Sequence, residues 1–320
     1  MSASKKTSKK KVSLNSKISG SKIYYSFFLL FFANVIVFSF FAYFIHRLYA
    51  SKIDVFGRQQ MQVVSIPKLD VSSEIEVTAA SYIVYDPLTR TVVLSKNPNM
   101  RLSPASSIKI LTALVALDQY DLNSYLSGIS ASYDESKMGL YIGEEISVEN
   151  LLYGLLLISG NDAAKTLAQN YPGGSDAFVK AMNNKAFDLK LTESMFFDPS
   201  GYLDNNYSTA FDMARLGSYA MKNGKIREIV GTKNKVVFDR YGLTVHPLIN
   251  LNELLNDRNV TGIKTGFTNE AGGVLLTSYV HSGREIIIVV MKSEDRFSDT
   301  RKIISEVEDK IYYSEVPSGV

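Results

Sequence analysis

The longest apolar run of the chain lies near its beginning. Residues 23–45 (IYYSFFLLFFANVIVFSFFAYFI) contain no charged side chain. A helix needs about 20 apolar residues to cross a bilayer, whereas the apolar core of a signal peptide has about 7–15. The run therefore predicts one transmembrane helix over 23–45, flanked by tyrosines as interfacial aromatics. The alternative is a cleaved signal peptide, with the cut after Ala50.

Beyond this run, the apolar spacing changes from strand to helix and back to strand. Residues 46–77 are mixed and polar without a lasting period, and we expect a linker there. Two β-rich runs around a turn at 86–90 predict a hairpin within 79–97. Helices are expected at 103–117, 147–159, 161–171, 175–189, 208–222 and 299–312, and strands at 235–239, 243–246, 260–267, 272–280 and 284–293.

This order predicts how the outer part of the chain is assembled. The hairpin comes first, a long helical stretch follows, and antiparallel strands with a closing helix complete the chain. A sheet built from both ends of a domain, with helices beside it, is an α+β arrangement. We therefore expect residues 78–315 to form an antiparallel sheet flanked by helices, with a large all-helical insert.

Charge is distributed unevenly along the chain. Seven lysines and no acidic residue precede residue 23, Arg47 follows, and the remaining 27 basic groups face 32 acidic ones. The formal net charge of +3 is therefore a property of the tail, and nothing in the outer part suggests a nucleic-acid-binding surface. Since lysine-rich flanks stay in the cytoplasm, we expect residues 1–22 inside and the large C-terminal part outside.

Several kinds of chemistry are absent from the sequence. Without cysteine there is no disulfide, zinc–thiolate site or thiol nucleophile. No H-E-x-x-H or other metal-binding spacing occurs, and no G-x-S-x-G nucleophile turn. His246 and His281 lie in or beside predicted strands or turns, where we interpret them as structural. We expect neither a metal ion nor a cofactor.

The first candidate for catalysis is a serine with a lysine one helical turn later. Ser106 and Lys109 follow Pro104 at a predicted helix start and lead into an apolar helix. Residues three apart share a helix face, and apolar surroundings favour the neutral, proton-accepting form of a lysine. The alternative is a helix-capping serine beside a lysine whose stem reaches water along the apolar surface. This motif alone favours the alternative.

Two further segments carry polar groups at positions suited to a cleft. Ser159-Gly160-Asn161 interrupts an apolar helix, although an ordinary turn with Asn161 as helix cap has the same pattern. Lys264-Thr265-Gly266 falls on a predicted strand. There Gly266 would let a ligand backbone approach, and its two neighbours offer donors for a carboxylate. An edge strand protected by lysine is the alternative.

Taken together, the three segments resemble the active-site set of penicillin-binding proteins and serine β-lactamases. In chain order they are Ser106-x-x-Lys109, Ser159-Gly160-Asn161 and Lys264-Thr265-Gly266. The surrounding stretches SPASSIKILTALVAL, GNDAA, DPSGYLDNNYSTAFDMARL and KTGFTNEAGG are similar to low-molecular-mass D-alanyl-D-alanine carboxypeptidases over about residues 78 to 312. In two respects we expect a departure from that pattern. After the peptidase part we expect neither a β-rich domain nor a C-terminal amphipathic anchor, and Asn206 stands where many relatives carry histidine.

The resemblance implies a fold, a reaction and roles for individual residues. It implies the DD-peptidase/β-lactamase-like fold, anchored by the N-terminal helix, and removal of the terminal D-alanine from peptidoglycan stem peptides through an acyl-serine. Penicillins would act as inhibitors. Ser106 would be the nucleophile and Lys109 its general base, while Ser159 passes a proton to the leaving amine and Asn161 positions Lys109 and the substrate amide.

Binding roles follow from the same resemblance. The backbone N–H groups of Ser106 and Phe267 would hold the oxyanion. Lys264 and Thr265, with Thr268, would bind the terminal carboxylate of the substrate. Arg296 is similar in setting to an arginine that serves this purpose in relatives.

Three other functions remain open from the sequence. A β-lactamase would need a carboxylate for efficient deacylation, but no E-x-x-L-N loop follows the second motif, and the segment at Glu193 does not match it. A DD-endopeptidase that cuts cross-links would share every residue named above. A non-catalytic penicillin-binding receptor or scaffold is a different class, and the short 22-residue tail argues against it.

Overall fold

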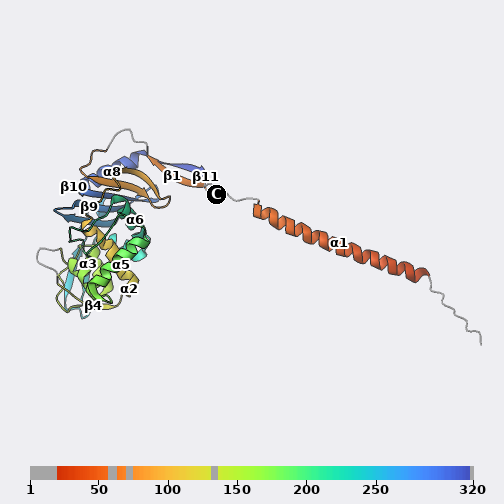
Figure 1. The fold of residues 1–320 in the computed structure, drawn as a ribbon, viewed down its shortest axis with the longest axis horizontal. Coiled ribbons are helices and arrows are strands. Elements are labelled where there is room, and N and C mark those ends of the chain that lie inside the picture. Colours follow the sequence, from red (N-terminus) through yellow and green to blue (C-terminus); the bar gives the residue numbers. More distant parts are fainter. Residues whose placement is uncertain (1–19, 57–62, 70–74, 131–135, 318–320) are drawn as a thin grey trace, which may run out of the picture. The chain divides into compact units, whose positions relative to one another are not determined.

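The computed structural model describes residues 20–56, 63–69, 75–130 and 136–317 (Figure 1). Two compact units are present, which we describe separately. The first comprises Met1–Gln62 with Pro317–Val320, and the second comprises Val63–Val316.

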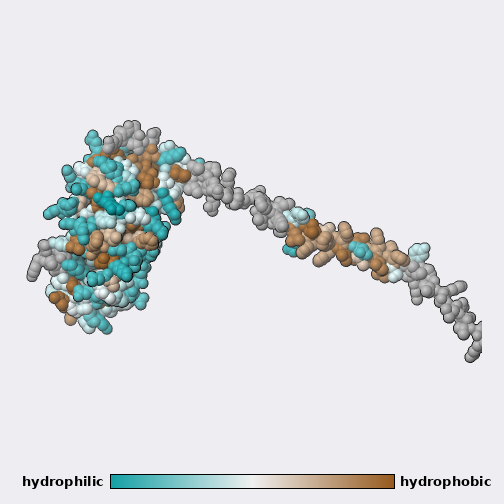
Figure 2. Space-filling view, viewed as in Figure 1, coloured by the Kyte–Doolittle hydropathy of each residue, from teal (hydrophilic) through white to brown (hydrophobic). Residues whose placement is uncertain are grey.

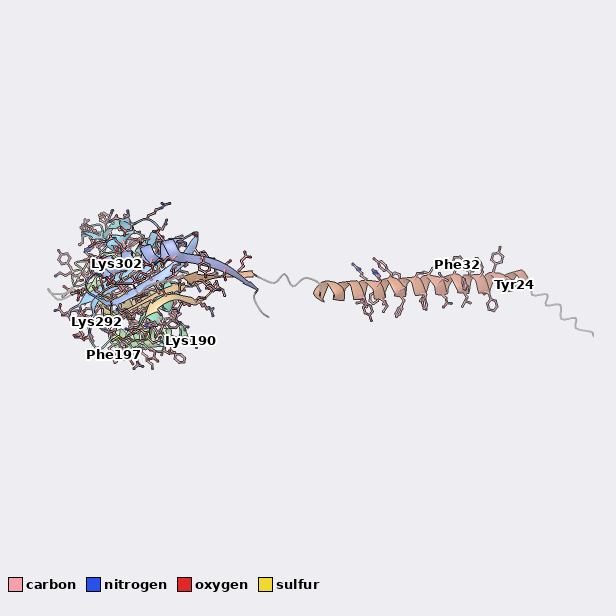
Figure 3. The ribbon with its side chains drawn as sticks, turned by 90° about the horizontal axis from the view of Figure 1, so that it is seen from above. Tyr24, Phe32, Lys190, Phe197, Lys292 and Lys302 are labelled. Atoms are coloured by element: carbon pink, nitrogen blue, oxygen red, sulfur yellow. The ribbon has the colours of Figure 1, made fainter. Side chains whose placement is uncertain are left out.

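The first unit contains one long helix, α1, Gly20–Phe56. Within it, Tyr24–Tyr49 is apolar enough to cross a membrane by length and composition, with a mean hydropathy of 2.4. Apolar side chains project from several sides of the helix, among them Tyr24 and Phe32 (Figures 2 and 3). A helix that is apolar all round lacks the polar face of a surface helix. The predicted span 23–45 lies within α1, whereas residues 1–19 of the basic tail lie outside the described residues.

The second unit is built around a five-stranded antiparallel sheet. Its strands are arranged in the order β3-β2-β10-β9-β8. They are β2 Ser81–Asp86, β3 Thr91–Lys96, β8 Val260–Thr268, β9 Gly272–His281 and β10 Arg284–Ser293. The predicted assembly from both ends of the domain is thus confirmed, and β8 is an edge strand.

Both faces of this sheet are covered. Successive side chains of a strand point to opposite faces, and β2 distributes its residues accordingly: Ile83 and Tyr85 belong to the larger core, Tyr82 and Val84 to the smaller. Helix α8, Arg296–Lys310, packs on the smaller core, and the helical insert covers the other face. The central strands are therefore continuous apolar runs.

The helical insert supplies the elements that face the sheet. Its helices are η1 Ala105–Ile108, α2 Lys109–Gln119, α3 Val148–Leu156, α4 Asn161–Gln169, α5 Gly174–Asp188, α6 Ala210–Ala220, α7 Gly224–Val230 and η2 Glu253–Asn256. Two small hairpins accompany them, β4 Tyr125–Ser127 with β5 Glu145–Ser147, and β6 Asn234–Phe238 with β7 Val245–Ile249. The sequence pattern missed α7, which at seven residues is too short for a helical period.

Both ends of the second unit differ from the prediction. The expected linker at 46–77 is wrong in part, since α1 runs to Phe56 and β1, Val63–Leu69, is a strand. Strand β1 pairs with β11, Ile311–Pro317, so the closing helix ends at Lys310 instead of 312. Strand β1 was not predicted because it contains Pro67, and a proline within an apolar run argues against any strand that is not at the edge of a sheet. The unit therefore begins near residue 63 instead of 78.

Candidate active site

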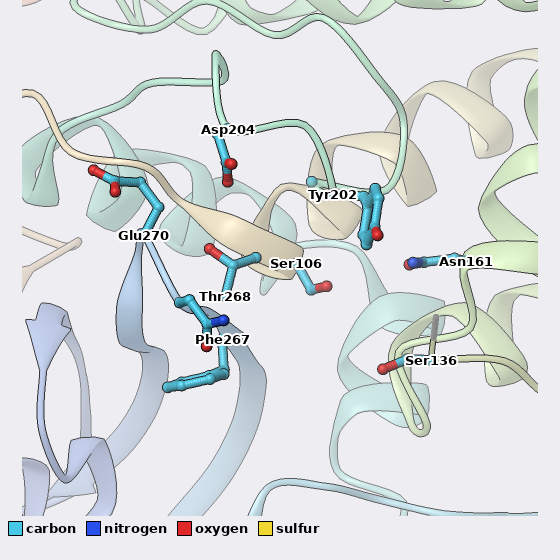
Figure 4. Close-up of a pocket in the computed structure, with 10 residues that line it drawn as sticks. Ser106, Ser136, Asn161, Tyr202, Asp204, Phe267, Thr268 and Glu270 are labelled. Carbon is cyan, nitrogen blue, oxygen red and sulfur yellow. The ribbon is translucent and has the colours of Figure 1, made fainter. Parts of the chain in front are cut away.

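The three sequence motifs meet around a cavity of about 410 Å³ in the second unit (Figure 4). Ser106 reaches it from η1, Asn161 from the start of α4, and Phe267 and Thr268 from the end of β8. In Figure 4 the Ser106 side chain lies between Asn161 on one side and Thr268 on the other. The topology thus brings together segments more than 150 positions apart in sequence.

Lys109 is the most constrained group of the site. Its side chain is 0% exposed. Its Nζ lies 2.8 Å from Ser106 Oγ, 2.6 Å from Asn161 Oδ1 and 2.6 Å from the Ser200 carbonyl oxygen. The alternative in which this lysine reaches water is therefore wrong.

These contacts suit a neutral amine as well as an ammonium. An ammonium donates three hydrogen bonds, which matches the three oxygens. A neutral amine has two N–H groups and one lone pair. With the N–H groups donated to the carbonyl oxygens of Asn161 and Ser200, the lone pair faces Ser106, whose hydroxyl can then donate to it. The arrangement can receive the proton of the serine.

The second motif reverses the chain between α3 and α4. Gly160 is the N-cap residue of α4, and the Asn161 side chain turns to Lys109, so the interpretation of Asn161 as helix cap is wrong. Ser159 has a left-handed backbone, with φ +62°, which is uncommon for a residue other than glycine. Its Oγ is buried and has no hydrogen-bond partner among the described residues. Such strained and unsatisfied groups concentrate at functional sites.

The third motif lies on β8 with its lysine turned inward. Lys264 is 1% exposed, so it does not protect the strand edge as the alternative required. Burial lowers the pKa of Lys264 well below its ordinary value, and the nearby charges of Lys109 and Arg296 lower it further. Gly266 is required by a close approach to η1, since a Cβ there would lie 3.0 Å from Ser106 N. The glycine brings the strand and the nucleophile into contact.

The remaining predicted binding residues follow along the same strand. Arg296 Nε donates to Thr265 Oγ1 at 2.5 Å from the first turn of α8. Phe267 is 58% exposed at the cavity wall. Thr268 also lines the cavity, and its Oγ1 accepts a hydrogen bond from Ala271 N. Thr265 thus contacts both basic side chains, Arg296 through its hydroxyl and Lys264 through its backbone carbonyl oxygen, to which Lys264 Nζ donates at 2.8 Å.

Comparison with known proteins shows which family has this arrangement of residues. Residues 68–295 match the peptidase S11 family model, described as D-alanyl-D-alanine carboxypeptidase. The chain belongs to the peptidase S11 family. Its fold agrees with that assignment, because the Streptomyces K15 DD-transpeptidase structure superposes with a TM-score of 0.68 at 30% identity, over 73% of this chain and 98% of that one.

Members of the S11 family with different names resemble this chain to a similar degree. A D-alanyl-D-alanine endopeptidase of Pseudomonas aeruginosa is 33% identical over 72% of this chain and 77% of its own length. The D-alanyl-D-alanine carboxypeptidase DacB2 of Mycobacterium tuberculosis is 36% identical over 67% of this chain and 74% of its own. Family membership establishes a serine hydrolase of the DD-peptidase class, without separating these activities.

One contributor to this S11 site was missed from the sequence. The Ser200 carbonyl oxygen contacts Lys109 because the turn at 198–203 is fixed in place. Asp198 accepts hydrogen bonds from the backbone N–H and hydroxyl of Ser200. Burial would raise the pKa of Asp198, but these bonds and one from Asn206 outweigh it and hold the pKa below its ordinary value. Gly201, with φ +76°, lies so close to η1 that a Cβ would overlap the Ala105 carbonyl oxygen at 2.0 Å.

A second missed contributor is the loop that forms the wall beside Asn161. Asp162 accepts hydrogen bonds from the backbone N–H groups of Met138, Gly139 and Leu140. The Asn161 backbone N–H donates to the Ser136 carbonyl oxygen at 2.8 Å, and Ser136 lines the cavity. The second motif therefore extends by one residue, to an aspartate that holds this wall in place.

The two histidines of the unit lie apart from this chemistry. His246 Nε2 is 2.6 Å from Glu144 Oε1, and its Nδ1 is 3.2 Å from the Met138 carbonyl oxygen. His281 packs near the ring of Tyr313. Neither lines the cavity, which agrees with their interpretation as structural.

The burial of Lys264 predicts a gain in stability when its charge is removed. Because the pKa of Lys264 is lowered by folding, the unfolded chain binds more protons between that pKa and about 10.5, and stability rises with pH in this window. Lys264→Met should raise the melting temperature at pH 7 by about 2–4 °C and flatten this pH dependence. Thermal unfolding of the second unit at several pH values measures both. An unchanged or lower melting temperature across the window would contradict the expectation.

Proposed function

We propose that the chain is a membrane-anchored D-Ala-D-Ala carboxypeptidase that removes the terminal D-alanine from peptidoglycan stem peptides through an acyl-serine. The observation that carries the proposal is the buried Lys109 amine, whose Nζ lies within hydrogen-bonding distance of Asn161, Ser200 and Ser106. Membership of the S11 family supports the class of substrate. Neither a metal ion nor a cofactor takes part in the proposed reaction.

Acylation begins at the hydroxyl of Ser106. Lys109 takes its proton while Oγ attacks the carbonyl carbon of the penultimate D-alanine. The developing oxyanion is held by the backbone N–H groups of Ser106 and Phe267. Gly266 supports this arrangement, because it lets β8 approach the backbone nitrogen of Ser106 closely. Ser159 relays the proton that Lys109 took from Ser106 to the leaving amine, the C–N bond breaks, D-alanine departs, and Lys109 is neutral again. Water then hydrolyses the acyl-serine.

The substrate is oriented by its terminal carboxylate. Lys264 and Thr265 bind it, with Thr268 and Arg296 at its sides, and Asn161 positions the substrate amide. The lowered pKa of Lys264 follows from burial beside two other cations, so a bound carboxylate supplies the missing counter-charge. Penicillins present a carboxylate and a reactive carbonyl with a similar separation. They therefore acylate Ser106 and leave slowly.

D-Alanine release is the direct test of this proposal. The purified second unit, Val63–Val316, which we call the outer unit, should release D-alanine from diacetyl-Lys-D-Ala-D-Ala, measured with a D-amino acid oxidase assay. The Ser106→Ala variant is the blank. Endopeptidase activity is the second candidate, supported by the Pseudomonas aeruginosa relative. A cross-linked muropeptide dimer in a parallel reaction separates the two. Faster cleavage of the dimer than of the tripeptide would assign the endopeptidase function instead.

Two other outcomes would assign a different function. Rapid turnover of penicillin, measured as the loss of its β-lactam absorbance, would indicate a β-lactamase. Stable penicillin binding without release from either peptide would indicate a non-catalytic receptor.

The membrane anchor makes a prediction about topology. Because the lysine-rich segment precedes the apolar stretch Tyr24–Tyr49, the N-terminus should remain inside and residues 63–316 outside. Protease added to intact cells without an outer membrane, or to spheroplasts, should remove the outer unit, detected with an antibody to that unit. A protected outer unit would contradict this orientation. A free, shortened form in the medium would indicate cleavage near Ala50.

A further inference from the structure

The catalytic cavity continues into a second cavity. Asp204 and Glu270 line both of them, and the second, also of about 410 Å³, extends past these acids to Arg101 and Lys292. In Figure 4, Asp204 and Glu270 lie on the side of Ser106 away from Asn161. All four charged side chains are exposed to solvent. None of them has a role in the proposed bond cleavage.

The position of the reacting groups decides what the second cavity can hold. In the proposed reaction the terminal carboxylate of the substrate lies at Lys264 and Thr265, and the reacting carbonyl lies at Ser106, opposite Gly266. The rest of the peptide must leave in the other direction along β8, toward its end at Thr268 and on to Glu270. At about 3.3 Å per extended residue, the residue before the two D-alanines reaches this region.

Charge alternates along this path. Lys264 and Arg296 stand at the carboxylate end, the acids Asp204 and Glu270 come next, and Arg101 and Lys292 follow. Arg101 is engaged by Glu193 at 2.7 Å, but both side chains are about half exposed. Such surface pairs contribute little, so a ligand carboxylate can replace Glu193 as the partner of Arg101. A complementary ligand therefore carries a negative charge at its terminal carboxylate, then a positive charge, and then a second negative charge.

We infer that the joined cavities form an upstream subsite for a peptide with a free side-chain amine next to the D-alanines and a carboxylate one residue further. The amine belongs beside Asp204 and Glu270, and the carboxylate beside Arg101 and Lys292. A stem peptide whose third residue is a diamino acid with an unmodified amine has this charge order. This inference rests on the proposed function, and it narrows the substrate to stem peptides in which that amine is not acylated.

The test for the amine uses two peptides and the parent protein. Nα-acetyl-Lys-D-Ala-D-Ala keeps the side-chain amine, whereas diacetyl-Lys-D-Ala-D-Ala has lost its charge. The parent should favour the free amine in kcat/KM by about 5- to 10-fold at low salt, and the preference should shrink at 0.5 M salt. Equal values would overturn the inference while leaving the proposed function standing. No release from either peptide would overturn both.

Substitutions then assign the preference to residues. Asp204→Asn and Glu270→Gln should each reduce the ratio of the two kcat/KM values, and the double variant should bring it close to one. Asp188→Asn is the matched control, because Asp188 is exposed but lines neither cavity. An unchanged ratio in the double variant would overturn the inference, since the ratio compares two substrates within one folded protein.

The carboxylate position is tested with longer peptides. Extending the free-amine peptide by a γ-linked D-glutamate should raise kcat/KM about 3- to 5-fold over the matching D-glutamine extension. Arg101→Gln and Lys292→Gln should reduce this ratio, whereas Lys222→Gln, an exposed change outside both cavities, should not. A ratio of one in the parent, or a ratio unaffected by both substitutions, would overturn this part of the subsite.

Discussion

Ser106→Ala is expected to abolish covalent labelling of the outer unit by fluorescent penicillin. The Ser106 hydroxyl lines the cavity and lies 2.8 Å from Lys109 Nζ, so in our mechanism it is the atom that forms the ester. Without it, binding and the oxyanion donors remain, but no covalent bond can form. In-gel fluorescence after denaturation measures the ester directly, and the signal should fall at least about 1,000-fold.

The neighbouring serine provides the control. Ser107 lies on the same short helix, is buried, and donates to the Pro104 carbonyl oxygen at 2.6 Å. Ser107→Ala should cost about 1 kcal/mol of stability through that lost bond and still be labelled. Labelling that survives in Ser106→Ala, with the fold confirmed by circular dichroism, would place the nucleophile elsewhere.

The five-stranded sheet could be predicted from the sequence because the burial of its strands produces a clear pattern of apolar residues. Strands β9 and β10 are covered on both faces, so they appear as long apolar runs bounded by the His281-Ser282-Gly283 turn. The separate two-stranded sheet of β1 and β11 was missed for the opposite reason. It lies outside the five-stranded sheet, and without a face buried in the main core its sequence shows little apolar regularity.

The candidate site was predictable where side chains carry the chemistry and hidden where the backbone does. Ser106, Lys109 and Asn161 were expected, and the structure brings them within hydrogen-bonding distance. The Ser200 carbonyl oxygen was not, because any residue type supplies one. Only the turn signature Asp-Pro-Ser-Gly at 198–201 indicated that this backbone is held in a special position. Aspartate and glycine, at Asp198 and Gly201, are the residues that hold it.

Lys109→Arg should slow acylation by about 10²- to 10⁴-fold, the usual contribution of a general base. Arginine keeps the positive charge, but it does not give up its proton in proteins. It therefore cannot accept the proton of Ser106. The buried position adds a second obstacle, because three oxygens surround Nζ at 2.6–2.8 Å, and the larger guanidinium cannot fit among them without moving Asn161 or the 198–203 turn.

A third variant separates the loss of the base from the effect of charge. Lys109→Met has neither charge nor lone-pair nitrogen, and its unbranched side chain suits the buried position. If Lys109 acts as the base, arginine and methionine should be about equally slow in penicillin acylation and in D-alanine release. If only the positive charge matters, arginine should be far faster than methionine. Release by Lys109→Arg at a rate comparable to the parent would make Lys109 structural, and Ser106 would then need another proton acceptor. Within the described residues, the lysine Nζ at 2.8 Å is the titratable group bonded to that hydroxyl.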